Sequence, residues 1–135
     1  AAPLRPASID AVLVDAPCTA TGTMRRHPDA RWRLKPSVFA RAAARQRQLL
    51  AAAAPLVRPE GAGRGGLLIY ATCSLEPEEN EQVVESFLNE HPEFTRSARN
   101  DAVPAELLTP AGDFQSLPQR HGIDGAYAAR LVRAS

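Results

Sequence analysis

The sequence predicts one α/β domain, because two apolar strand-like runs flank a helical segment. Residues 9–15 (IDAVLVD) are typical of a strand buried on both faces, as central parallel strands are. A helical pattern covers residues 37–57, and a second apolar run (LLIYAT) follows at 67–72. The order strand, helix, strand indicates a crossover that places both strands parallel in one sheet.

The remaining elements follow from local signals. Ser37 is a suitable N-cap for the first helix, and Pro59 lies just past its end. Pro77 and the acidic residues after it favour the start of a second helix at 76–77, which HPEF at 91–94 ends. We expect a short strand near 94–98, a proline-rich turn region up to residue 120 and a last strand at 125–132.

The composition excludes several classes of protein. With 44% hydrophobic residues, 23% charged residues and a net charge of +1, the chain is neither disordered nor membrane-spanning, and no apolar run approaches the roughly 20 residues that a bilayer requires. Its start has no secretory signal pattern. Two distant cysteines do not form a disulfide framework, so we expect free thiols and a cytoplasmic location.

The charges are distributed unevenly along the chain. Residues 25–47 carry eight basic residues against one Asp, whereas residues 76–106 carry nine carboxylates against two Arg. A polyanion such as RNA would be drawn to the basic segment. Arg41, Arg45 and Arg47 fit an ordinary solvated helix face. The arginines nearer the first strand, Arg25 and Arg26, better fit RNA binding.

The two cysteines are expected to meet. Cys18 lies just past the carboxyl end of the first strand, and Cys73 lies at the carboxyl end of the second. Sites in open α/β sheets form at these ends, and neighbouring strands are about 4.8 Å apart. If the two strands pair directly, both thiols face one crevice with Asp15 beside them.

Several chemistries are open to such a pair. A buried cysteine can be an inert small hydrophobe. A thiolate at Cys73 would be a nucleophile, favoured by the dipole of a helix that begins at 76–77. A redox pair would usually appear as C-x-x-C, which is absent. The three histidines lack ligand spacing, so no metal site is expected.

Three segments together resemble the RNA cytosine-5 methyltransferases of the Sun/Nop family, most closely the members that act on 16S ribosomal RNA. DAPCTATGTMRRHPDARW (15–32) resembles the family's motif IV, and YATCSLEPEENE (70–81) resembles its motif VI. SLPQRHGIDGAYAARLVR (116–133) resembles the family's C-terminal segment, which usually has aromatic residues after Asp-Gly. The resemblance covers nearly the whole chain.

The resemblance implies a class I, Rossmann-like methyltransferase sheet, mostly parallel with an antiparallel last strand. It implies S-adenosylmethionine-dependent methylation of cytosine C5 in ribosomal RNA, on a base that leaves its stack. Cys73 would attack C6 and Cys18 would assist release, whereas DNA enzymes attack with a Pro-Cys cysteine, so position alone does not choose between the two. Asp15 would bind the pyrimidine and border the cofactor. Apart from the resemblance, the position of Arg25, Arg26 and Arg31 beside the DAPC loop predicts that they hold RNA phosphate.

The same resemblance makes residues 1–135 the C-terminal part of a catalytic domain, with DAPC at 15–18 and TCS at 72–74. No glycine-rich turn follows a strand, so the cofactor loop, and with it the RNA-binding domain, is expected upstream. The isolated chain is then expected to be inactive, with a sheet edge covered by the N-terminal half or a dimer partner. The alternatives are a non-catalytic RNA-binding or folding module and, less fittingly, a DNA methyltransferase.

Overall fold

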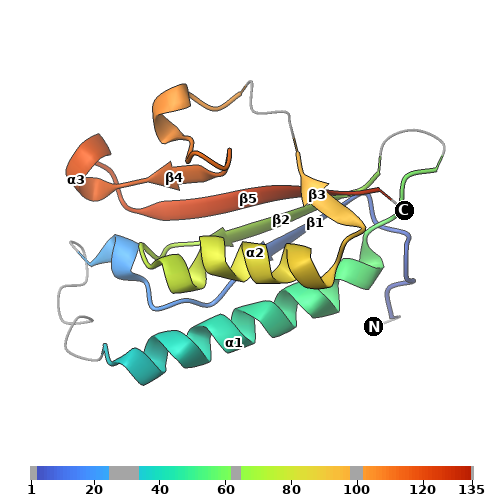
Figure 1. Cartoon of the computed structure of the whole chain (residues 1–135), viewed down its shortest axis with the longest axis horizontal. Helices are drawn as coiled ribbons and strands as arrows, with labels where there is room; N and C mark the ends of the chain where they lie inside the picture. The colour runs from blue at the N-terminus through green and yellow to red at the C-terminus, as the bar shows by residue number, and fades with distance from the viewer. Residues whose placement is uncertain (1–2, 25–33, 62–64, 98–101, 135) are drawn as a thin grey trace.

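The computed structural model describes residues 3–24, 34–61, 65–97 and 102–134 (Figure 1). Strands and helices alternate along the first part of the chain, and the later part is richer in strands. The elements are β1 (Ala11–Asp15), α1 (Pro36–Ala53), β2 (Leu67–Thr72), α2 (Glu81–Glu90), β3 (Phe94–Arg96), β4 (Phe114–Ser116), α3 (Pro118–His121) and β5 (Ala126–Arg133).

The strands form one mixed sheet in the order β1-β2-β5-β3, with β4 also paired to β5. β1 and β2 are parallel neighbours, and Asp15 is in register with Ala71. β5 is antiparallel to β2, β3 and β4, so it alone among the described strands runs against the common direction. The predicted α/β fold, with a mostly parallel strand direction and an antiparallel last strand, is confirmed.

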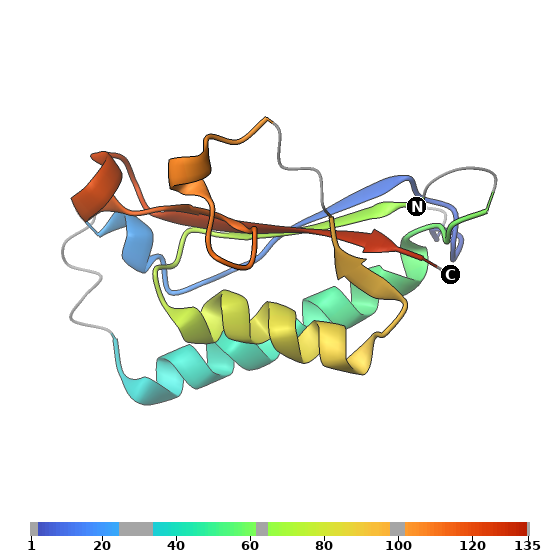
Figure 2. The same ribbon diagram turned by 45° about the horizontal axis from the view of Figure 1, so that its top comes forward.

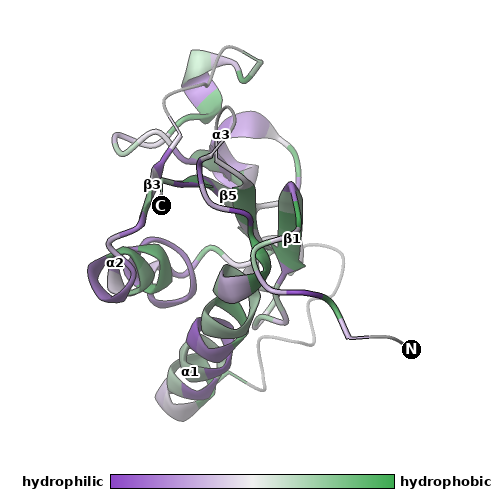
Figure 3. Cartoon of the chain, turned by 90° about the vertical axis from the view of Figure 1, so that its right-hand side faces the viewer, coloured by the Kyte–Doolittle hydropathy of each residue, from purple (hydrophilic) through white to green (hydrophobic). Residues whose placement is uncertain are grey.

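Both long helices pack on the same face of the sheet (Figures 2 and 3). Alternate residues of β2 and β5 point toward them, because side chains along a strand alternate between the two faces. Leu68 and Tyr70 of β2 and Leu131 of β5 are fully buried there. They pack with Leu50 of α1 and Val84 of α2, and this layer forms the hydrophobic core.

The prediction that the first strand is buried on both faces is wrong. β1 is the edge strand of the sheet, with β2 as its neighbour on one side. Val12 and Val14 are half-buried toward the helices, whereas Leu13 points to the opposite face and is 64% exposed. The apolar run is that of a central strand, but nothing among the described residues covers this end of the sheet.

Two further expectations need correction. The second helix begins at Glu81, because residues Pro77–Glu79 form a separate 3-10 turn. The proline-rich region expected to be turn contains β4 and the short helix α3. Within the described ranges, no helix combines the length and the apolar character needed to cross a bilayer.

Candidate active site

The two cysteine sulfurs meet at the carboxyl edge of the sheet. Cys18 Sγ lies 3.0 Å from Cys73 Sγ. The parallel pairing of β1 and β2 causes this approach, and it continues past the strands with the Ala16 N–H donating to Ala71 O at 2.9 Å. Both thiols are free and half-buried. The sheet therefore brings together two reactive groups that are far apart in sequence.

Cys18 lies in surroundings that raise its pKa. Burial, and then the hydrogen bond with Cys73, raise the pKa of Cys18 to about 12. A thiol with this pKa keeps its proton at neutral pH and can donate it toward the neighbouring sulfur. The geometry of the contact allows either sulfur to be the donor.

A buried carboxylate, Glu79, joins the loops that carry the two cysteines. It accepts hydrogen bonds from the Thr19 N–H at 2.8 Å, from Thr19 Oγ1 at 2.6 Å and from Gln46 Nε2 at 3.1 Å. The hydroxyl of Ser74 donates to it as well. Thr19 follows Cys18 and Ser74 follows Cys73, so one fully buried side chain fixes both loops. All four donors are neutral, and they replace the water that the carboxylate loses.

The neighbouring Asn80 clamps the backbone around Cys73. Thr72 Oγ1 donates to Asn80 Oδ1 at 2.6 Å, and Asn80 Nδ2 donates to Ser74 O at 2.9 Å. These inward bonds give Asn80 a non-helical backbone (φ −113°, ψ −100°) and delay α2 to Glu81. The predicted dipole of a helix beginning at 76–77 is therefore not available to Cys73. Side-chain hydrogen bonds organise this loop instead.

Gly22 is the point where three segments touch. Its N–H donates to Cys73 O at 2.8 Å, and Gly125 N–H donates to Gly22 O at 2.8 Å. A Cβ at Gly22 would lie 2.3 Å from Gly125 O and 2.6 Å from Cys73 O, which no real side chain tolerates. The contact ties the Asp-Gly turn before β5 to the loops of both cysteines, and it requires glycine.

The other predicted site residues lie differently. Asp15 is exposed at the end of β1, on the sheet face away from the helices, and no hydrogen bond joins it to either cysteine within the described residues. The proposed phosphate-binding Arg25, Arg26 and Arg31 lie outside the described residues. Their roles stay predictions.

Glu79, Asn80 and Gln46 were not foreseen as site residues. One signal was available for Gln46, since it occupies a core position in the buried series of α1 with Ala43, Leu50 and Ala53. A polar residue at such a position needs a buried partner. No comparable signal marks Glu79, because acidic residues are ordinary at the start of a helix.

Against known proteins, the family model described as 16S rRNA methyltransferase RsmB/F matches residues 3–132. The chain belongs to this RsmB/F family. It is 44% identical over 124 residues to the Ribosomal RNA small subunit methyltransferase B of Erwinia tasmaniensis, covering 92% of this chain and 26% of that protein. The corresponding protein of Thermus thermophilus is also 44% identical over 124 residues, with 92% and 29% covered.

Two solved structures are similar to this chain over most of its length. The crystal structure of PH0851 superposes with a TM-score of 0.83 at 39% identity, covering 95% of this chain and 27% of that one. NSun6 from Pyrococcus horikoshii with SFG gives 0.73 at 27% identity, covering 91% and 29%. The chain thus spans about a quarter of the length of the relatives that it matches.

The methyl donor implied by the family, S-adenosylmethionine, fits one feature of the described residues. The exposed Asp15 carboxylate at the carboxyl end of β1 can accept a hydrogen bond from the ammonium of its methionine end. Leu13 leaves an uncovered apolar surface on the same face of the strand. The charge and exposure of Asp15 are therefore compatible with such a group.

Proposed function

We propose that the protein carrying this chain methylates carbon 5 of cytosine in small-subunit ribosomal RNA, with S-adenosylmethionine as the methyl donor. The observation that carries the proposal is the 3.0 Å contact between Cys18 and Cys73 at the carboxyl ends of two parallel strands. Membership of the RsmB/F family supports the substrate class. Carbon 5 of cytosine is a weak nucleophile, so the reaction needs covalent activation.

In this proposal the Cys73 thiolate forms a bond to C6 of the ring. The electron pair displaced from the C5–C6 double bond makes C5 nucleophilic, and the sulfonium cofactor supplies the methyl group that C5 takes. The C5 proton then passes to water, and the S–C6 bond breaks to restore the double bond. Cys18 donates its S–H toward the departing Cys73 sulfur, which its raised pKa permits. Asp15 accepts a hydrogen bond from the pyrimidine edge.

Two cysteine variants test this division of roles in the protein that carries the chain. We expect Cys73→Ala to abolish methylation and to form no covalent RNA adduct. In Cys18→Ala the Cys73 thiolate still attacks the base. The departing Cys73 sulfur then lacks its proton donor, so a protein–RNA adduct accumulates. Denaturing gels and the mass of the product nucleoside give both readouts.

The opposite gel pattern would assign the attack to Cys18. Full methylation by both variants would reduce the thiols to core packing, whereas RNA binding without methylation by the wild type would favour a non-catalytic RNA-binding module. For the isolated chain we expect only weak cofactor binding, since no glycine-rich turn follows a strand in its sequence. Low-micromolar affinity by calorimetry would contradict that expectation.

A further inference from the structure

A groove lies on the helix side of Cys18, apart from the contact with Cys73. It has a volume of about 290 Å³ and runs between the loop after β1 and the first half of α1. Figure 1 shows this blue loop passing along the cyan part of the helix. The groove is lined by Pro17, Cys18, Thr19, Val38, Arg41, Ala42 and Arg45. This volume is at the small end of the range for ligand sites, so the groove suits a single monomer unit of a larger polymer.

The groove combines an apolar wall with two positive charges. Pro17, Val38 and Ala42 supply the wall. Arg41 and Arg45 are exposed and four residues apart on one helix face, about 6 Å between Cβ atoms. No carboxylate within the described part of the chain forms an ion pair with either of them. Helix α1 contains no Asp or Glu, so among the described residues neither guanidinium has a carboxylate partner and each can meet an anion.

We propose that this groove binds the nucleotide next to the target cytosine in single-stranded RNA. The base packs on Val38 and Ala42, and the phosphates on either side of it meet Arg41 and Arg45. Guanidinium groups match phosphate with two parallel hydrogen bonds, whereas the wall accepts the apolar face of any base. Because Cys18 lines the groove and touches Cys73, an occupant of the groove lies beside the proposed reacting sulfur. The inference rests on the proposed function.

The experiment measures binding of a short cytosine-containing RNA to the protein that carries this chain, by fluorescence anisotropy over a range of salt concentrations. The main variant is Arg41→Ala with Arg45→Ala. Arg47→Ala is the matched control, since Arg47 is exposed on the same helix but does not line the groove. Alanine favours helix at least as well as arginine, so these variants keep α1.

We expect the double variant to bind about tenfold more weakly. Each phosphate contact to single-stranded RNA releases counterions and so favours binding, and the variant loses two such contacts. The slope of log affinity against log salt should fall by about 1.4, the sum for two contacts. Ala42→Leu narrows the groove without changing charge, so it should weaken binding with an unchanged slope. The proposal is overturned by a wild-type slope in the double variant, or by an equal loss in Arg47→Ala.

The same samples separate this inference from the proposed function. If the wild type makes 5-methylcytidine while the double variant binds RNA as tightly as the wild type, only the groove proposal fails. If the double variant loses binding but the wild type makes no 5-methylcytidine, the groove stands as an RNA site and the proposed reaction fails.

Discussion

The pKa of Cys18 distinguishes the two thiols at the scale of single residues. Raised from its usual 9.0 to about 12 by burial and by Cys73, the pKa means that folding disfavours the Cys18 thiolate. The resulting stabilisation of the fold is fully present below pH 9.0 and is lost as the pH rises from 9.0 toward 12. Cys18 therefore keeps its proton above pH 9.0 only while its loop is folded.

Alkylation should report this difference directly. We expect the rate of Cys18 modification by iodoacetamide to keep rising between pH 9.0 and about 12 in the native protein. In guanidinium the same peptide should level off near pH 9, as an unperturbed thiol does. Mass spectrometry of the Cys18 peptide measures both profiles. Coincident native and unfolded profiles would contradict the proposed role of Cys18 as a proton donor.

Glu79 should matter far more than the acidic residue beside it. Glu79→Gln replaces an acceptor oxygen with an amide that faces the donors Thr19 and Ser74, so a buried donor loses its partner. We expect a loss of about 1–3 kcal/mol in the free energy of unfolding, measured in urea. The control Glu78→Gln changes an exposed carboxylate by less than about 0.5 kcal/mol.

The amount of RNA adduct formed at a fixed time should fall in Glu79→Gln and remain normal in Glu78→Gln. Equal stability and equal adduct yield in the two variants would show that the buried carboxylate does not position the cysteines.

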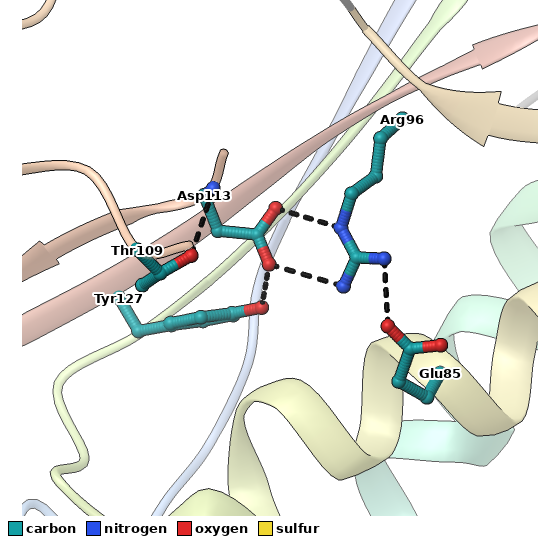
Figure 4. A network of polar contacts seen from close by, with 5 residues as sticks. All are labelled: Glu85, Arg96, Thr109, Asp113 and Tyr127. Carbon is teal, nitrogen blue, oxygen red and sulfur yellow. Dashed lines mark hydrogen bonds and ion pairs between the residues drawn. The ribbon is translucent and has the colours of Figure 1, made fainter. Parts of the chain in front are cut away.

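At the scale of elements, a second polar network joins α2, β3 and β5 (Figure 4). Arg96 donates to both oxygens of Asp113, from Nε at 3.1 Å and Nη2 at 3.2 Å, and to Glu85 Oε1 at 2.7 Å. The hydroxyl of Tyr127 also donates to Asp113, whose N–H donates to Thr109 Oγ1. Burial alone would lower the pKa of Arg96, but the bonds to Asp113 and Glu85 outweigh it and raise that pKa.

Removing the cation from this network should be costly. In Arg96→Met the buried side chain of Asp113 loses its cationic partner. We expect a loss of about 3–5 kcal/mol of unfolding free energy, because one partner of a buried ion pair is removed. Glu85→Gln, at the exposed end, should cost less than about 1 kcal/mol. Thermal unfolding of both variants checks this, and equal small losses would make the network dispensable.

The elements show which features the sequence could predict. The helical spacing in residues 37–57 and the apolar run at 67–72 predict α1 and β2, because their periodicity is local. The helix between the two predicted strands implies that the strands are parallel. This parallel order is the reason that both cysteines are expected at one edge of the sheet. The start of α2 was missed because the side chains of Glu79 and Asn80 bond to loops distant in sequence. Tertiary contacts of this kind leave no periodic signal.

β4 and β1 show the same limit of prediction from sequence, one as a strand with a weak signal and the other as a strand with a strong signal. β4 has a weak strand signal and exists because β5 offers it a partner at Ala126–Ala128. β1 has a strong strand signal, and its apolar run predicted burial on both faces. An apolar run reports the environment a strand requires, so it cannot say whether the described chain provides the cover.

At the scale of the whole molecule, one side of β1 is left uncovered by the described residues. Leu13 is 64% exposed and lies on a strand whose outer edge pairs with no other strand among the described residues. We expect the isolated chain to self-associate as its concentration rises, which analytical ultracentrifugation measures. Leu13→Lys should reduce this association, because a charge on an edge strand opposes pairing. A monomer at all concentrations, in both forms, would show that the edge is protected by other means.

The two neighbouring thiols can also be used to test whether the whole site is assembled. A trivalent arsenical such as phenylarsine oxide bridges two thiols, with loss of water, only when the sulfurs are close together. Cys18 and Cys73 come from loops that Glu79 and Gly22 hold in place, so they should chelate one arsenic atom in the native state. Titration with the reagent would therefore reveal whether a variant has kept its crevice assembled, without any RNA, cofactor or assay of turnover.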